Sequence, residues 1–278
     1  MYPQDLNQLL LMTPMERAQY VLENETIFEK IYSMIGDDNA QLRDQQNYRL
    51  FLQLLSENAI PDNVVHEYVQ RLTSSEGMLY EIGEVGNTSV FQRSYSALTL
   101  AAIVNADRQL LLLTAEELEQ ILTSALSLFS KEQDLRSYVN EYCGWAHSIA
   151  HTADLLCAII QHPHYPVKYT AHILQGIRQN LWKGYVFQDD EEERFCNIVE
   201  SLLGKDIGED LLIEWFEQLY DYLEMVAFER GYDANWFKAR TNLLAISKTM
   251  YFYLKFTNRS DKLRGIISIF IQRWLKLN

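Results

Sequence analysis

Helix-breaking residues are few and clustered in this sequence, and their spacing constrains the fold more than any other feature. Between the five prolines and eleven glycines, apolar residues recur at intervals of three and four, which is the spacing of one face of an α-helix. No alternating run with hairpin-turn residues stands out. The one irregular stretch, residues 77–89, contains three glycines, and a small strand or a loop would fit there.

Two helix starts are marked by capping boxes, in which a threonine is followed three residues later by a glutamate. These are Thr13 with Glu16 and Thr114 with Glu117, and Pro14 adds a proline at the first helical position. The periodicity predicts helices near residues 14–35, 42–57, 61–72, 92–106, 114–129, 131–142, 144–161, 167–182, 190–203, 209–229, 235–257 and 260–276.

Short connections between successive helices favour antiparallel neighbours that stack side by side. The sequence therefore predicts an all-α fold of stacked antiparallel helical hairpins, either a HEAT-like α-solenoid or an irregular α-α superhelix. No fixed repeat period and no long linker are evident. We accordingly expect a single all-helical domain over residues 1–278.

Composition excludes several classes of protein. Aromatic residues make up 12% of the chain, which is more burial than a disordered chain carries. The three cysteines, Cys143, Cys157 and Cys196, are odd in number and form no CxxC pair, so we expect no disulfide scaffold. Such cysteine usage fits a reducing compartment, and we expect a cytoplasmic location. The first residues lack the basic start of a secretion signal, and no apolar run reaches the length of a membrane span. We expect no membrane partner.

The net charge of −14 argues against nucleic acid as the partner of the whole molecule, because phosphate contact requires a basic surface. The C-terminal stretch, residues 234–278, differs: it has nine basic residues against one acid, Asp261, which gives +8. Its basic and aromatic residues alternate in a way that single-strand binders use. We favour the simpler interpretation, in which amphipathic terminal helices offset the acidic body of the protein.

Residues 144–161 form the most apolar predicted helix, and Asp154 is its only charged side chain. A helix that is apolar nearly all round is expected to be surrounded by other helices. His147, His151 and Asp154 nevertheless follow at i, i+4 and i+7, which places them within an arc of about 60°. The sequence therefore predicts a buried helix that directs three polar groups to one side, and we expect the neighbouring Trp145 to be a core indole.

Residues 92–106 form a second helix of this kind, in which Arg93 is the only charge. A lone buried ion costs several kcal/mol unless it is paired. We therefore predict an ion pair between Arg93 and Asp154, in a buried or groove-lining cluster with the two histidines. The nearby Asp134 and Arg136 are candidates to extend that cluster.

Five short runs carry a family resemblance: IG (35–36), LRD (42–44), VFQRSYSAL (90–98), DLR (134–136) and, most specifically, GWAHSIAHTADLL (144–156). Over roughly residues 31–200 the chain resembles the bacterial family called domain of unknown function 2785. The resemblance implies an all-helical, HEAT-like fold. It implies no particular reaction.

Three functions remain open for the predicted cluster. The first is a ligand-binding or interaction module without catalysis, whose groove is lined by Arg93, His147, His151 and Asp154 and whose partner is a small molecule or a protein. The second is a divalent metal site with His147, His151 and Asp154 as ligands. The third is metal-free acid–base catalysis by a histidine, with an arginine holding a small anionic substrate. Either of the last two would make the protein a hydrolase, with catalytic candidates His147, His151, Asp154, Arg93, Asp134 and Arg136. A purely structural hydrogen-bond network is the alternative to all three.

Overall fold

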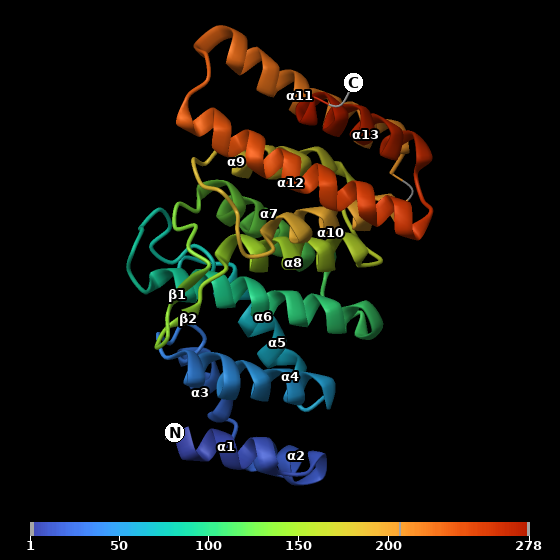
Figure 1. Cartoon of the computed structure of the whole chain (residues 1–278). Helices are drawn as coiled ribbons and strands as arrows, with labels where there is room; N and C mark the ends of the chain where they lie inside the picture. Colours follow the sequence, from blue (N-terminus) through green and yellow to red (C-terminus); the bar gives the residue numbers. More distant parts are fainter. Residues whose placement is uncertain (1–2, 206, 277–278) are drawn as a thin grey trace. The chain divides into compact units, whose positions relative to one another are not determined.

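The computed structural model describes residues 3–205 and 207–276, and it divides into two compact units, Met1–Pro166 and Val167–Asn278 (Figure 1). The predicted all-α class is confirmed, since only one small two-stranded sheet accompanies the helices of the described residues. The single domain over residues 1–278 stays a prediction, and residues 1–2, 206 and 277–278 of that span lie outside the described residues.

The elements of the first unit are α1 (Pro3–Leu11), α2 (Pro14–Glu23), α3 (Ile27–Ser33), the π-helix η1 (Gln41–Tyr48), α4 (Arg49–Ser56), α5 (Asp62–Leu72), α6 (Ser89–Leu110), α7 (Ala115–Lys131), β1 (Tyr138–Asn140), β2 (Gly144–Trp145) and α8 (Ser148–Gln161). The second unit contains the 3₁₀ helix η2 (Val167–Tyr169), α9 (Thr170–Leu181), α10 (Glu191–Leu203), α11 (Glu209–Arg230), α12 (Ala234–Thr257) and α13 (Asp261–Leu275).

Both predicted capping boxes are present. The Thr13 side chain accepts a hydrogen bond from the Glu16 N–H, and the Glu16 carboxylate accepts one from the Thr13 N–H. Thr114 and Glu117 make the same reciprocal pair at the start of α7. Each box satisfies N–H groups that have no partner inside the helix, which is why these two helices begin where the sequence predicts.

In the first unit, pairs of helices follow one another in layers from α1 and α2 to α7 and α8 (Figure 1). Helix α6 lies at the centre, because it packs against α4, α5, α7 and α8. Its Leu100 and Val104 are fully buried, as are Leu155 and Ile159 of α8. Burying a side chain of this size stabilises the fold by roughly 1.5–3 kcal/mol. The prediction that both helices lie in the core is confirmed.

The helix expected over residues 131–142 does not form. Helix α7 ends at Lys131, because the carboxylate of its C-cap residue Glu132 turns back to accept hydrogen bonds from the N–H groups of Gln133 and Asp134. The chain then runs extended into the antiparallel pair of β1 and β2. Helix α8 accordingly begins at Ser148 and not at residue 144. Residues 77–88 consist of turns and bends without a strand.

The short hairpin is held close to the N-terminal half of the first unit. Gly144 has a φ of +66°, and a Cβ at this position would approach the Cβ of Ala40 to 2.8 Å. Only glycine combines this backbone conformation with so close an approach. The Ala40 N–H donates to the carbonyl of Tyr142, which fixes the hairpin beside the start of η1.

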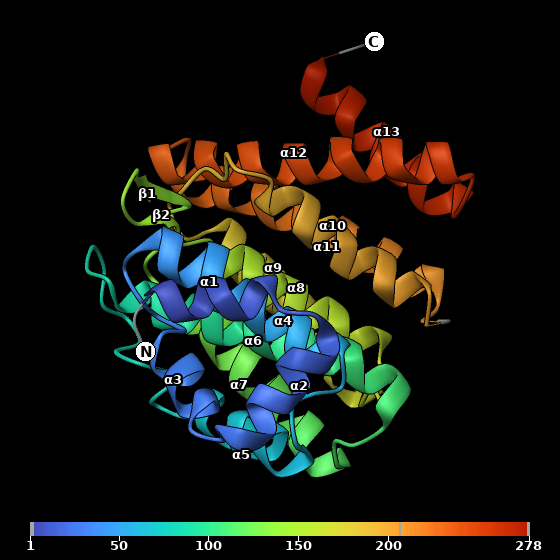
Figure 2. The same ribbon diagram turned by 90° about the horizontal axis from the view of Figure 1, so that it is seen from below.

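In the second unit, α12 packs against α9, α10, α11 and α13, and Figure 2 shows these helices around it from below. Its Trp236 donates its indole N–H to the carbonyl of Leu223 over 2.8 Å. The side chain of Asn242 accepts a hydrogen bond from the Phe187 N–H and donates to the carbonyl of Tyr185. Buried polar groups of this long helix thus have partners, as a stable core requires. No helix within the described residues is both long and apolar enough to span a membrane.

Candidate functional site

Helix α8 exposes only one side. From residue 147 to residue 160, His147, His151, Asp154 and Cys157 are half-buried, and every other residue is buried. These four positions follow at i, i+4, i+7 and i+10, so they form one stripe along the helix. The common direction of the two imidazoles and the carboxylate stays a prediction, although the rings of His147 and His151 are in contact, with centroids 5.9 Å apart.

Arg93 does not join this stripe, and its predicted ion pair with Asp154 is wrong. Arg93 is fully buried, and its Nε and Nη2 lie 2.7 and 2.9 Å from the two carboxylate oxygens of Glu132. Glu132 follows α7 directly, and α7 packs against α6. A buried guanidinium pairs with a nearby carboxylate that can accept two parallel hydrogen bonds from it. The spacing of residues in the sequence does not reveal which carboxylate lies close enough.

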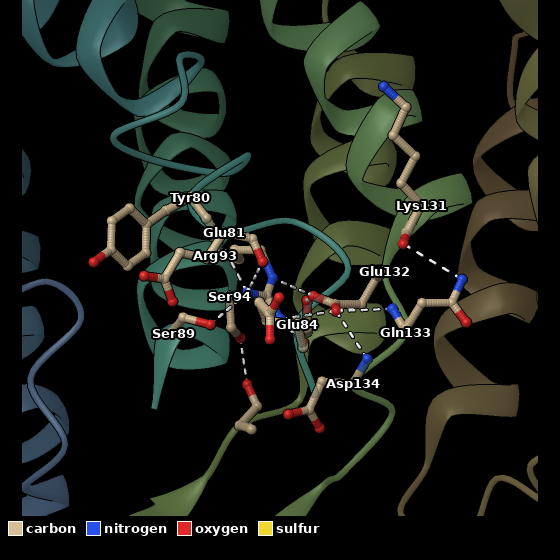
Figure 3. Close-up of polar contacts among 12 residues, drawn as sticks. Tyr80, Glu81, Glu84, Ser89, Arg93, Ser94, Lys131, Glu132, Gln133 and Asp134 are labelled. Atoms are coloured by element: carbon tan, nitrogen blue, oxygen red, sulfur yellow. Dashed lines mark hydrogen bonds and ion pairs between the residues drawn. The ribbon is translucent and has the colours of Figure 1, made fainter. Parts of the chain in front are cut away.

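The remaining N–H groups of Arg93 fasten the turn segment that precedes α6 (Figure 3). Nη1 donates to the carbonyls of Tyr80 and Glu81 and to the Ser89 hydroxyl, and Nη2 donates to the carbonyl of Glu84. All three guanidinium nitrogens of Arg93 are therefore engaged within the protein, which leaves this side chain no role in holding a ligand.

Glu132 is saturated in a similar way. Besides Arg93 it accepts hydrogen bonds from the Ser148 hydroxyl over 2.8 Å and from two backbone N–H groups. Because both members are fully buried, these extra donors offset the cost of removing the two charges from water. The Arg93–Glu132 cluster thus joins α6, α7 and the first turn of α8.

Asp134 and Arg136 pair with each other. Arg136 Nη2 lies 2.6 Å from Asp134 Oδ2, which also accepts a hydrogen bond from the Gly86 N–H. Burial raises the pKa of Asp134, but the hydrogen bonds from Arg136 and Gly86 outweigh burial and hold the pKa below its usual value. This pair reinforces the turn segment and, unlike the prediction, does not extend the stripe of α8.

The hydrogen bonding of His151 defines its tautomer. The Ser94 hydroxyl donates its only proton to the carbonyl of Ala146, so at its other contact, 2.8 Å from His151 Nδ1, it can only accept. The neutral imidazole of His151 therefore carries its proton on Nδ1, and Nε2 is its basic atom. Ser94 was not among the predicted site residues, and its place one residue after Arg93 gives no signal of this contact.

His147 lies one turn earlier with an unusual backbone. Its φ is +52°, in the left-handed region that a non-glycine residue rarely adopts. Its ring centroid lies 5.9 Å from that of His151 and 4.7 Å from that of Trp145. Trp145 is 42% exposed, so the expectation of a core indole is wrong. The reason is that Trp145 lies in the hairpin strand β2, outside the buried helix in which the sequence placed it.

The metal site formed by His147, His151 and Asp154 stays a prediction. In the part of the chain that the structure describes, no three His, Cys, Asp or Glu side chains are grouped so that they could hold a metal ion.

An open groove of about 870 Å³ lies along the accessible side of α8. Its lining includes Tyr48 from η1, Leu52 and Leu55 from α4, Leu98, Ala102, Asn105 and Gln109 from α6, and Asp154, Cys157 and Gln161 from α8. Of the predicted residues, Asp154 lines this groove, whereas Arg93, His147 and His151 do not. Among the described residues that line it, Asp154 is the only one with a formal charge.

Tyr48 lines the same groove as Asp154. Burial, and secondarily the negative charge of Asp154, raise the pKa of the Tyr48 phenol to about 12. Tyr48 is the last residue of the π-helix, a form that often occurs at functional sites. Earlier in the π-helix the guanidinium of Arg43 stacks 4.2 Å from the ring centroid of Phe91 and 4.4 Å from that of Tyr95. This stacking ties η1 to α6 and thereby positions Tyr48.

Comparison with known proteins gives one match. No curated protein and no solved structure matches the chain. A family model described as "Protein of unknown function (DUF2785)" matches residues 78–252. This match covers well over half of the 278 residues and includes α6, α8 and the buried Arg93–Glu132 cluster between them. The chain therefore belongs to the DUF2785 family of proteins of unknown function.

Proposed function

We propose that this chain is a binding protein whose groove between α4, α6 and α8 takes a small molecule that carries a positive charge. The observation that carries the proposal is the position of Asp154, a half-buried carboxylate and the only charge among the described residues that line the groove. A carboxylate that is partly removed from water attracts a cation more strongly than a fully solvated one. An ammonium or guanidinium group is the cation that would complement it.

The rest of the lining indicates the body of this ligand. The leucines of α4 and the alanines of α6 in the lining offer apolar contacts, and Asn105 and Gln109 offer amide groups. The volume of about 870 Å³ falls within the range typical of small-molecule sites, roughly 300–1,000 Å³. An amine with an apolar body of moderate size fits this combination.

The test is to measure binding of a panel of apolar amines by isothermal titration calorimetry, with the neutral alcohols of the same shape beside them. The variant Asp154→Asn keeps the size of the side chain and removes its charge, and it is expected to lower affinity for the amine by about tenfold or more. Glu116→Gln, at an exposed position on α7, makes the same change in net charge away from the groove and serves as the control. Equal affinity for amine and alcohol would contradict the proposal.

A second candidate, a His-based or metal-assisted hydrolase, is favoured by one observation. The hydrogen bond to Ser94 places the proton of the neutral His151 imidazole on Nδ1, so the lone pair that proton transfer or metal binding requires is on Nε2. Of the two arginines that are candidates to hold an anionic substrate, Arg93 is buried and paired with Glu132, and Arg136 is paired with Asp134. Elemental analysis of the purified protein and of the His147→Ala/His151→Ala variant tests this candidate. Stoichiometric metal that the variant loses would support it.

Two broader proposals concern architecture and location. The succession of packed helical pairs in the first unit supports a HEAT-like arrangement, and the odd number of cysteines without a CxxC pair supports a cytoplasmic location. The bacterial origin rests on the family resemblance alone. Fractionation of cells that express the tagged protein would test its location.

A further inference from the structure

A second cavity, of about 700 Å³, lies within the second unit among α11, α12 and α13. Its charged lining residues are Arg240, Arg273, Lys276 and Glu224. Three cations against one carboxylate make this a basic site in a protein whose net charge is −14. The cavity is thus opposite in sign to the groove on α8.

Aromatic side chains form the walls of this cavity and are unusually exposed. Phe228 is 92% exposed, Tyr232 is 70% exposed and Phe237 is 50% exposed. The ring of the buried Trp236 holds two of them in place, with centroids 4.7 Å from Tyr232 and 5.1 Å from Phe237. Solvated rings that are fixed in this way present faces on which a flat ligand can stack.

Two of the cations have no carboxylate partner. Arg273 pairs with Glu224 over 2.7 Å, but no acidic side chain of the described residues lies within ion-pair distance of Arg240 or Lys276. The Arg240 guanidinium instead stacks 5.0 Å from the ring centroid of Trp274. The indole N–H of Trp274 is itself buried and has no acceptor among the described residues. Two cations without a carboxylate partner and an indole N–H without an acceptor among the described residues thus line the same aromatic cavity.

We propose that this cavity binds a nucleoside phosphate, with the base stacked on the exposed rings and the phosphate bound by Arg240 and Lys276. The aromatic side chains of the cavity can stack on a planar ring, and its cations can bind an anion, so a ligand that joins the two fits the site. The same unit of base and phosphate also occurs in single-stranded nucleic acid. The free nucleotide is the source that we favour, because the acidic protein repels a long polyanion.

The experiment titrates the full chain with AMP, adenosine and a single-stranded oligonucleotide, each by isothermal titration calorimetry. We expect AMP to bind and adenosine to bind at least about tenfold more weakly, because adenosine lacks the phosphate. Arg240→Gln is expected to weaken AMP binding by about tenfold. The matched control is Lys248→Gln, which removes one exposed cation from the same helix outside the cavity and is expected to leave binding unchanged.

Lys276→Gln provides a second variant at an exposed position, so the result does not depend on whether Arg240→Gln folds. Three outcomes would overturn the proposal: no AMP binding at about millimolar concentration, equal binding of adenosine and AMP, or equal losses in Arg240→Gln and Lys248→Gln. If the oligonucleotide bound more tightly than AMP, with a steep salt dependence and the same sensitivity to Arg240→Gln, the ligand would be single-stranded nucleic acid and the proposal of a free nucleotide would also be overturned.

Discussion

The Ser94 hydroxyl accepts a hydrogen bond from His151 Nδ1 over 2.8 Å while it donates to the carbonyl of Ala146. This relay of two hydrogen bonds fixes the half-buried imidazole of His151 on α8. It also means that Ser94 has no proton to give to His151, so the pair is not arranged as a nucleophile and its base.

The first prediction concerns this relay. In Ser94→Ala the Nδ1–H of His151 and the carbonyl of Ala146 both lose a partner, which should lower the free energy of unfolding by about 1–3 kcal/mol. Nitrogen-15 NMR of His151 should show loss of the dominant Nδ1–H tautomer. Ser96→Ala is the matched control, since Ser96 is equally buried on α6 and its hydroxyl has no hydrogen-bond partner among the described residues. Its removal should cost little, and an equal cost for both variants would contradict the relay.

The second prediction concerns the buried ion pair. Arg93→Met leaves the Glu132 carboxylate buried without its cation, and a loss of about 3–5 kcal/mol in the free energy of unfolding is expected. The pair of half-buried Arg264 and exposed Asp261 offers the comparison, because Arg264→Met should cost no more than about 1 kcal/mol. Urea denaturation of both variants measures the difference. Similar costs would mean that the Arg93 cluster does not stabilise the first unit.

The third prediction is a pH dependence that arises from His162. The ring is buried at the end of α8, with Nε2 3.1 Å from Asp107 Oδ2 and with Nδ1 accepting from the His164 N–H. Burial lowers its pKa below the ordinary value of 6.5, against the opposing effect of Asp107.

Because the unfolded chain takes up the proton first, the stabilising contribution of His162 is fully present above pH 6.5 and is lost as the pH falls through the lowered value. The free energy of unfolding should therefore fall in this window, and it should fall less steeply in His162→Gln. Urea titrations at a series of pH values test this, and an unchanged slope in the variant would count against it.

The fourth prediction separates backbone strain from steric contact in the hairpin. Gly144→Ala should destabilise the protein by more than about 1–2 kcal/mol, because it adds a contact with Ala40 to the cost of a positive φ. Gly83→Ala is the control for strain alone, since its φ is +99° and no atom lies within 4 Å of the added Cβ. Melting temperatures would show the two effects, and equal shifts would mean that the contact with Ala40 relaxes without cost.

The sequence predicts those features that depend on local chemistry. The capping boxes at Thr13 and Thr114 form as expected, because each needs only residues within one turn. The stripe of α8 is likewise predicted from helical spacing, and it begins at His147 although the helix itself begins one residue later. The burial of α6 and α8 follows from the scarcity of charged side chains in residues 92–106 and 144–161, each of which has a single one.

Features that depend on distant partners were not predicted. Arg93 pairs with Glu132 and not with Asp154 because α7 ends beside α6. The periodicity of the sequence does not indicate where α7 ends relative to α6. The hairpin replaced an expected helix because the Glu132 carboxylate caps its own following backbone. Tyr48, which lines the groove together with Asp154, is the last residue of a π-helix, and a π-helix has no clear sequence signature.

The hydrogen bonds from Arg93 to the carbonyls of Tyr80, Glu81 and Glu84 affect the order of events in folding. This turn segment lacks the internal hydrogen bonds of a helix. It is held by Arg93, which is fixed only once the Glu132 carboxylate at the end of α7 has bound it. During refolding, its peptide bonds should thus become resistant to proteases after α6 and α7 have met, which makes the segment a late reporter of assembly in the N-terminal unit.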